Sequence, residues 1–164
     1  MKDILIIANS GWNIFNFRSE LIKKLNEKKY NIYISCPRDN YIDEVLKNQS
    51  YYYFPLVLDR KSFNIFLNFK IIFDILILYY KIKPDYVFSF TIKPNIYGNL
   101  ASLFYFYKTK QINFITGLGT YYLSNKILKN LIFILYKIAF FKSYNVFFQN
   151  KIDKNIFISK KIID

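Results

Sequence analysis

Residues 86–116, YVFSFTIKPNIYGNLASLFYFYKTKQINFIT, hold two short hydrophobic runs separated by a helix-like segment. The runs YVFSF (86–90) and INFIT (112–116) are rich in aromatic and β-branched residues, which is typical of strands. Residues 95–107, which lie between them, predict a helix. The stretch therefore predicts a β–α–β unit, in which a helix connects two strands of one sheet.

The same alternation of strand and helix continues in both directions along the chain. Further strands are predicted at 4–8, 31–35, 52–57 and 145–149, and further helices at 16–29, 40–47, 62–82, 124–142 and from Lys151 onward. The strands are continuous hydrophobic runs, which is typical of a sheet that helices cover on both faces. We therefore predict an α/β fold with a doubly wound, mainly parallel, Rossmann-like sheet.

Composition limits the class of protein and its partners. The 164 residues suffice for one domain, and 24 Lys and Arg against 11 Asp and Glu give a net charge of +13. This charge favours an anionic partner, which could be nucleic acid, a phosphorylated metabolite or an anionic membrane surface. The lysines are scattered, and no basic helix or nucleic-acid-binding motif is present, so we expect no nucleic acid.

The sequence also excludes several kinds of site. It contains no histidine, which removes histidine bases and histidine metal ligands, and Cys36 alone forms no disulfide, so no metal site is expected. We expect Cys36 to be a buried structural thiol in a reduced, cytosolic setting. The apolar segments at 63–80 and 131–141 are interrupted by charged or polar residues, and neither is expected to span a membrane.

In an open α/β sheet, ligands bind beyond the carboxyl ends of the strands. The first such loop, NSGWNIFNFR (9–18), contains neither G-x-G-x-x-G nor a Walker A pattern, which disfavours a dinucleotide site. The loop still leads into a helix N-terminus, which attracts anions. Ser10 would line this position, and Gly11 would either let the backbone approach a ligand or simply form the turn.

Three basic residues in these segments are candidates for binding an anion. On a helical wheel Arg18 lies on the apolar face, so it needs a partner, either a protein carboxylate or a bound phosphate. Lys93 follows the carboxyl end of a strand, where Pro94 would end the strand and Asn95 would cap the next helix. Arg60 follows the third strand, where it could bind a ligand or pair with its neighbour Asp59.

The loop after the strand at 112–116 contains Thr116, Gly117 and Gly119. One glycine could serve only as a turn residue. Two glycines so close together indicate that the backbone approaches a ligand or a facing domain.

These segments together resemble the N-terminal domain of GT-B glycosyltransferases of family 4. They are most similar to the bacterial enzymes that extend polyprenyl-diphosphate-linked sugars or assemble surface polysaccharide of the cell envelope. The segments that carry the resemblance are NFRSELIKKLNEKKYNIYISCP (16–37), LDRKSFN (58–64), KPDYVFSFTIKPNIYGNLAS (83–102), ITGLGT (115–120) and VFFQNKID (146–153). The pair TIKPNIYG and TGLGT is the most specific part.

The resemblance implies an enzyme of two Rossmann-like halves that face each other across a cleft. Residues 1–164 would be the N-terminal, acceptor-binding domain, and the C-terminal donor-binding domain would be absent. The full enzyme would move a sugar from a nucleotide-sugar, a UDP-sugar, to a lipid-linked or glycan acceptor. This chain would bind no cofactor itself, would be inactive alone and could pair with a separate donor-binding subunit; no catalytic residue is assigned.

The resemblance also assigns roles to the candidate residues. Those expected to hold the acceptor phosphate are Gly11, Arg18, Arg60, Lys93 and Asn95, and those expected to line the cleft are Ser10, Thr116, Gly117 and Gly119. The apolar helix faces and the excess of lysine would suit peripheral docking on the inner face of the plasma membrane, although burial against the sheet is expected for most of that surface. The alternative function is a non-catalytic membrane-docking or partner-binding module with the same fold.

Overall fold

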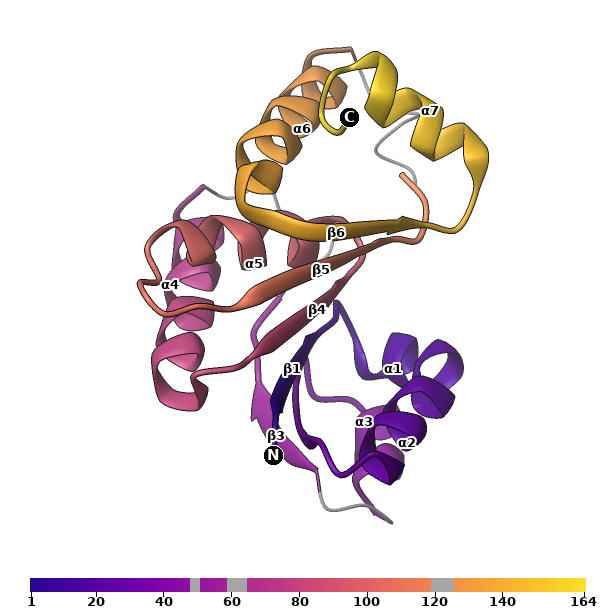
Figure 1. Ribbon diagram of the computed structural model, residues 1–164, viewed down its shortest axis with the longest axis vertical. Coiled ribbons are helices and arrows are strands. Elements are labelled where there is room, and N and C mark those ends of the chain that lie inside the picture. Colours follow the sequence, from indigo (N-terminus) through magenta and orange to yellow (C-terminus); the bar gives the residue numbers. More distant parts are fainter. Residues whose placement is uncertain (48–50, 59–64, 119–125) are drawn as a thin grey trace.

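The computed structural model describes residues 1–47, 51–58, 65–118 and 126–164, which form a six-stranded sheet with helices on both sides (Figure 1). The strands are β1 (Asp3–Ile7), β2 (Asn31–Cys36), β3 (Tyr52–Pro55), β4 (Tyr86–Phe90), β5 (Lys110–Ile115) and β6 (Ser143–Phe148). The α-helices are α1 (Gly11–Phe17), α2 (Ser19–Glu27), α3 (Asn40–Leu46), α4 (Ile65–Ile82), α5 (Ile92–Leu103), α6 (Lys126–Ala139) and α7 (Lys151–Ser159). A short 3-10 helix, η2 (Phe140–Lys142), follows α6.

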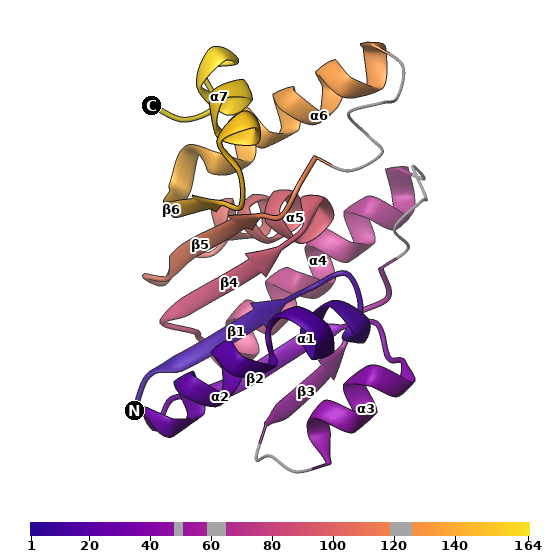
Figure 2. The same cartoon turned by 90° about the vertical axis from the view of Figure 1, so that its right-hand side faces the viewer.

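The strands are all parallel and lie in the order β3-β2-β1-β4-β5-β6, as Figure 2 shows. The chain begins in the middle of the sheet, builds outward to β3 and then returns to β4 on the other side of β1. Ile6 of β1 therefore lies between Ile34 of β2 and Phe88 of β4. This topology confirms the predicted doubly wound, Rossmann-like fold, and it places a switch point between β1 and β4.

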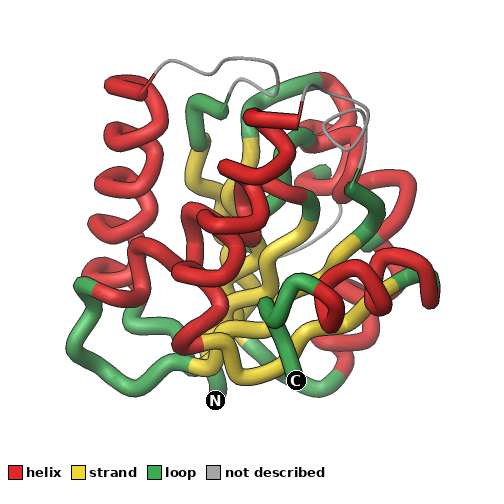
Figure 3. The backbone as a smooth tube through the Cα atoms, turned by 90° about the horizontal axis from the view of Figure 1, so that it is seen from above, coloured by secondary structure: helices red, strands yellow, loops and turns green. Residues whose placement is uncertain are grey.

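Each face of the sheet has its own hydrophobic core, as expected for strands that are buried on both sides. Ile4 and Ile6 pack in the core shared with α1, α2 and α3, whereas Leu5 and Ile7 pack in the core shared with α4, α5 and α6. The alternation arises because successive side chains of a strand point to opposite faces. Figures 1 and 3 show the two helical layers with the strands between them.

The first helical segment differs from the prediction. Instead of one helix at 16–29 preceded by a turn, the structure has α1 and α2, and α1 begins at Gly11. Ser10 adopts an extended conformation and its hydroxyl accepts a hydrogen bond from the Asn13 amide at 3.2 Å, so Ser10 caps α1. The helices meet at Arg18, whose φ of −126° and ψ of −7° interrupt the helical path.

Helix α4 buries only one of its faces against the sheet. Ile71, Ile75 and Tyr79 are buried in the core, whereas large apolar side chains on its opposite face are exposed. Burial against the sheet therefore accounts for one side of α4 and not for its outer side. Within the described ranges, no helix combines the length and apolar character needed to cross a bilayer.

Candidate functional site

The carboxyl ends of β1 and β4 meet at the switch point of the sheet, where doubly wound folds bind ligands. The connection after β1 leads into α1 and Arg18, and the connection after β4 leads through Thr91 into α5. Both connections carry residues that the sequence singles out. The switch point is therefore the candidate functional site, and its charge and hydrogen bonding decide what it could bind.

The N-terminus of α1 is already occupied by a carboxylate of the protein. Asp39 accepts hydrogen bonds from the amides of Trp12, at 3.1 Å, and Ile42, at 2.9 Å, so it joins the starts of α1 and α3. A Cβ atom on Gly11 would lie 2.0 Å from the Asp39 carboxylate, which explains why this position requires glycine. Gly11 therefore makes room for Asp39, and an anion here would be repelled by that carboxylate.

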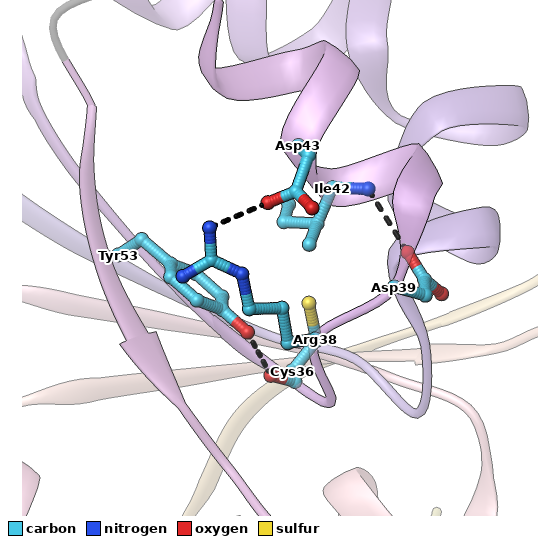
Figure 4. A network of polar contacts seen from close by, with 6 residues as sticks. All are labelled: Cys36, Arg38, Asp39, Ile42, Asp43 and Tyr53. Atoms are coloured by element: carbon cyan, nitrogen blue, oxygen red, sulfur yellow. Dashed lines mark hydrogen bonds and ion pairs between the residues drawn. The ribbon is translucent and has the colours of Figure 1, made fainter.

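Figure 4 shows that the polar contacts after β2 are internal to the loop, the start of α3 and β3. Arg38 pairs with Asp43 at 2.9 Å, and the Tyr53 hydroxyl donates to the Cys36 carbonyl at 2.9 Å. Burial raises the pKa of the Cys36 thiol to about 12, and the neighbouring Asp39 carboxylate adds to the shift. Cys36 is fully buried, as the sequence predicts, and a thiol in this state is a structural group rather than a nucleophile.

Arg18 presents a very different environment. Its guanidinium carbon lies 4.3 Å from the centre of the Phe90 ring, and its Nε atom is buried without a hydrogen-bond partner. Burial lowers the pKa of Arg18, and no carboxylate within the described ranges forms an ion pair with it. Of the two predicted partners for Arg18, a protein carboxylate and a bound phosphate, the described residues do not supply the first.

The ring below Arg18 is held firmly in place. Phe90 stacks on Phe114 of β5 with ring centres 4.5 Å apart and planes 19° apart, and Phe114 stacks on Phe147 of β6 at 5.2 Å and 17°. These three rings form a row across neighbouring strands. The cation–π contact thus fixes Arg18 on a rigid surface, and its Nε–H group remains a donor without an acceptor.

Thr91 joins β4 to α5 in a backbone conformation that only glycine adopts easily, with φ of 73° and ψ of 171°. Its hydroxyl oxygen is buried without a partner and makes no capping hydrogen bond to α5. The first turn of α5 contains no acidic residue. Unlike α1, whose start binds the Asp39 carboxylate, α5 begins with no carboxylate in its first turn and no side-chain cap from Thr91, directly after the strand whose Phe90 supports Arg18.

Lys93 and Asn95 both lie in the first turn of α5. Lys93 is only 8% exposed, so most of its side chain is shielded from solvent. Asn95 does not cap the helix as predicted, because the cap position is Thr91. Instead, Asn95 is fully buried and its side-chain amide donates to the Phe114 carbonyl at 3.0 Å, which ties the start of α5 to the end of β5. A phosphate contact from either residue stays a prediction.

The remaining candidates lie in the connections after β1, β3 and β5. Thr116 and Gly117 follow the carboxyl end of β5 and are both partly exposed, and Gly117 has a φ of 116°, which explains the glycine there. Ser10, which is also a predicted cleft residue, is buried and acts as the cap of α1. Arg60 and Gly119 lie outside the described residues.

Sequence reasoning missed three residues of this site. Phe90 looks like an ordinary strand residue, and no sequence pattern marks it as the surface on which Arg18 lies. Asp39 precedes a predicted helix and could have been identified as its cap, but its second bond to the start of α1 depends on the fold. The strain at Thr91 has no signal in the sequence.

The family model described as "Glycosyl transferase 4-like" matches residues 3–150. A curated relative from Campylobacter jejuni, an N,N'-diacetylbacillosaminyl-diphospho-undecaprenol alpha-1,3-N-acetylgalactosaminyltransferase, is 26% identical over 153 residues. That alignment covers 88% of this chain and 39% of the relative, so the chain spans about two fifths of the relative's length.

Two solved structures show the same fold at low sequence identity. The UDP-GlcNAc 2-epimerase of Neisseria meningitidis, bound to UDP-GlcNAc, has a TM-score of 0.66 and 16% identity over 98% of this chain and 44% of its own. MurG of Acinetobacter baumannii has a TM-score of 0.54 and 16% identity over 70% of this chain and 35% of its own. In each case the similarity extends over less than half of the larger protein.

Proposed function

Because this chain belongs to the glycosyl transferase 4-like family, we propose that it is the N-terminal, acceptor-binding half of a bacterial glycosyltransferase. The complete enzyme would move a sugar from a nucleotide-sugar, a UDP-sugar, to a lipid-linked or polysaccharide acceptor. The name of the Campylobacter relative specifies a diphospho-undecaprenol acceptor, which supports this proposal. The donor would bind to a second half, whether it is joined to this one or supplied by a separate subunit.

The observation that carries the proposal is the position of Arg18 at the switch point. A lipid diphosphate is anionic along its whole linker, so a protein that binds it needs a cation that is not already paired. Arg18 is such a cation, because it lies on the Phe90 ring and its buried Nε lacks an acceptor. The start of α5 adds the positive end of a helix dipole beside it.

In the proposed reaction, an acceptor hydroxyl attacks the anomeric carbon of the donor sugar. The new carbon–oxygen bond forms as the bond to the nucleotide diphosphate breaks, the diphosphate leaves with the bonding electrons, and the hydroxyl proton passes to a base. The residues of this half would hold the acceptor diphosphate and orient its sugar toward the donor. A lipid-linked acceptor also places the protein at the cytoplasmic face of the membrane.

Binding of a short-chain prenyl-diphosphate sugar to the chain, measured by isothermal titration calorimetry, tests this role. Replacing Arg18→Gln should weaken binding by about tenfold to a hundredfold, because a charge-assisted contact to the diphosphate is lost. Arg38→Gln is the matched control, since Arg38 is an exposed arginine that pairs with Asp43. Equal affinities for the two variants would contradict the assignment of Arg18.

A second measurement tests whether this half acts alone. We expect purified residues 1–164 to release no UDP from a UDP-sugar in the presence of acceptor. Sustained turnover would contradict the proposal that the donor binds to a second half. In an enzyme reconstituted from both halves, Lys93→Ala should raise the KM for acceptor. Unchanged acceptor kinetics would show that Lys93 has only a structural role.

A further inference from the structure

The amino-terminal edge of the sheet carries an open cavity of about 370 Å³, at the opposite end of the strands from the switch point. The residues that line it precede β1 or lie at the starts of β4 and β5, and they are Lys2, Asp85, Tyr86, Lys108, Thr109 and Lys110. Figure 2 shows these three strand starts on the side of the sheet where the chain begins. The volume falls at the lower end of the roughly 300–1,000 Å³ that is usual for ligand pockets, so a small molecule would fit.

Two of the lysines are held against tyrosine side chains in a row that crosses the strands. The Lys2 ammonium donates to the Tyr86 hydroxyl at 3.2 Å and lies 5.2 Å from the centre of the Tyr86 ring. Lys110 is the register partner of Tyr86, and its ammonium lies 5.7 Å from the centre of the same ring. Lys110 also donates to the Tyr144 hydroxyl of β6 at 3.3 Å. The pairing of the strands and these ring contacts therefore fix the two ammonium groups on either side of Tyr86.

The cavity offers more hydrogen-bond donors than acceptors. An ammonium group has three N–H donors and no acceptor, and a phenol oxygen that accepts from lysine keeps its own O–H as a donor. The hydroxyl oxygen of Thr109 is buried without a hydrogen-bond partner among the residues that the structure describes. The carboxylate of Asp85 is already engaged, because its Oδ2 atom accepts from the Asp3 amide at 2.8 Å. A ligand for this cavity therefore has to supply acceptors.

The charges of the lining residues do not cancel. In the described part of the chain, none of Lys2, Lys108 and Lys110 forms an ion pair. Asp85 is the only acidic residue among the lining residues, so the three lysines leave two positive charges in excess. A phosphate monoester carries about 1.5 to 2 negative charges at pH 7 and has three strong acceptor oxygens. Its phosphate group thus matches the cavity in both charge and hydrogen bonding, and lysine binds phosphate as a point charge.

We propose that this cavity binds the phosphate group of a small phosphorylated molecule, with Lys2, Lys110 and the Tyr86 hydroxyl as its ligands. The phosphate could be free inorganic phosphate or part of a phosphate monoester, and the same three groups would hold it in either case. The site lies at the opposite edge of the sheet from Arg18, so it does not depend on the proposed function.

The test follows the backbone amide signals of the ¹⁵N-labelled chain by NMR while inorganic phosphate or, separately, glucose 1-phosphate is added. We expect saturable shifts at the amides of Tyr86, Thr109 and Lys110, and none at Phe90 and Thr91, which lie at the other end of β4. Equal affinities for the two probes would identify free phosphate as the ligand. Tighter binding of glucose 1-phosphate would identify a phosphate monoester, and either result supports the proposal.

The double variant Lys2→Gln, Lys110→Gln should bind the tighter probe at least about tenfold more weakly, because two charge-assisted contacts are lost. Tyr86→Phe keeps the ring and removes the hydroxyl, and it should weaken binding by about threefold to tenfold.

The matched control is Lys126→Gln, Lys151→Gln, which removes the same charge from two exposed lysines at the starts of α6 and α7. It should bind the probe as the unmodified chain does. Circular dichroism should show that all the variants are folded.

Three results would overturn the proposal. One is the absence of saturable shifts at the cavity with both probes. Another is equal weakening by the two double lysine variants, which would show that only the net charge of the chain attracts phosphate. The third is a set of shifts confined to the carboxyl ends of the strands, which would place phosphate at the switch point alone. Because the amides report each end of the strands separately, this proposal and the assignment of Arg18 can fail independently.

Discussion

Thr91 shows how a single residue can carry strain at a candidate site. Its φ of 73° with ψ of 171° lies in a region that is nearly exclusive to glycine, and such strain costs on the order of 1–3 kcal/mol. The cost persists because β4 and α5 on either side are both buried and fixed. Strain of this kind clusters at ligand sites, which agrees with the place of Thr91 between Phe90 and α5.

We expect Thr91→Gly to raise the free energy of unfolding by about 1 kcal/mol, since relief of strain exceeds the added entropy of the unfolded glycine chain. Thr91→Ala is the control, because it also removes the buried, unpaired hydroxyl but keeps the Cβ atom that causes the strain. Urea unfolding of both variants separates the two effects. If the alanine variant is as stable as the glycine variant, the backbone of Thr91 carries no measurable strain, and loss of the unpaired hydroxyl explains the gain.

Gly11 is required for close packing, and its substitution should show this directly. A Cβ atom there would lie 2.0 Å from Asp39 Oδ1 and 2.7 Å from both the backbone nitrogen and the Cβ of Ile42, so α1 and α3 would have to move apart. Gly11→Ala should therefore destabilise the protein by about 2–4 kcal/mol in urea unfolding.

The control for Gly11 is Gly98→Ala in α5. Its Cβ atom would lie 3.0 Å from the Ser89 hydroxyl and 3.3 Å from the Tyr79 hydroxyl, which can shift slightly, and alanine favours the helix. The Gly98 variant should lose less than about 1.5 kcal/mol. A larger loss at Gly98 than at Gly11 would contradict the packing explanation for both positions.

At the scale of the element, α5 is unusual because none of its residues is exposed. A helix in this position must satisfy its polar side chains internally. The side-chain amide of Asn99 donates to the side-chain oxygen of Asn113 on β5 at 2.6 Å and to the backbone carbonyl of Asn95 at 2.7 Å. The side-chain amide of Asn113 in turn donates to the hydroxyl of Ser143 on β6 at 2.7 Å. This network holds α5 at a fixed position on β5 and β6, and so it fixes the start of α5 at the switch point.

We expect Asn99→Ala to destabilise the protein by about 2 kcal/mol, because it leaves the buried Asn113 carbonyl without its donor. The double variant Asn99→Ala, Asn113→Ala should cost at least about 0.5 kcal/mol less than the sum of the single variants, since the pair is coupled. Asn16→Ala, which removes an exposed hydrogen bond to Trp12, is the control and should have little effect. Additive costs in urea unfolding would argue against a coupled network.

Periodicity in the sequence predicts most elements, but local chemistry decides where they begin. All six strands and the principal helices were predicted from apolar patterns. Pro94 was interpreted as the end of a strand, yet it lies in the first turn of α5, where a missing N–H costs nothing. The sequence also does not mark where several helices end. Lys29, Lys83 and Lys161 adopt positive φ values at positions where glycine would normally signal the end of a helix.

At the scale of the whole molecule, the sequence predicts which edge of the sheet carries the site but not which residues meet there. The parallel, doubly wound arrangement follows from the hydrophobic runs, and the edge follows from that arrangement. The inward position of Arg18 could also be predicted from its place among apolar residues. Its contact with Phe90 could not, because the two residues are 72 positions apart and meet only through the pairing of β1 with β4.

The stability of the whole molecule should fall in alkali. Burial raises the pKa of Cys36 from 9.0 to about 12 and that of Tyr53 from 10.0 to about 12, and it also raises the pKa values of Tyr79 and Tyr136. These groups are neutral when protonated, so between their unfolded and folded pKa values the folded chain holds more protons than the unfolded chain. Their contribution to stability is therefore complete below about pH 9 and decreases as the pH rises toward 12.

Urea unfolding at a series of pH values between about 8 and 11 measures this dependence, and the unfolding midpoint should decrease steadily above about pH 9. Cys36→Ala removes one contributing group, so its midpoint should be lower at pH 8 because a cavity forms, but should fall less steeply with pH. The slope is the informative quantity, because a purely structural loss would shift the curve without changing its steepness. Parallel curves for the variant and the unmodified chain would show that the Cys36 thiol ionises as easily in the folded state as in the unfolded state.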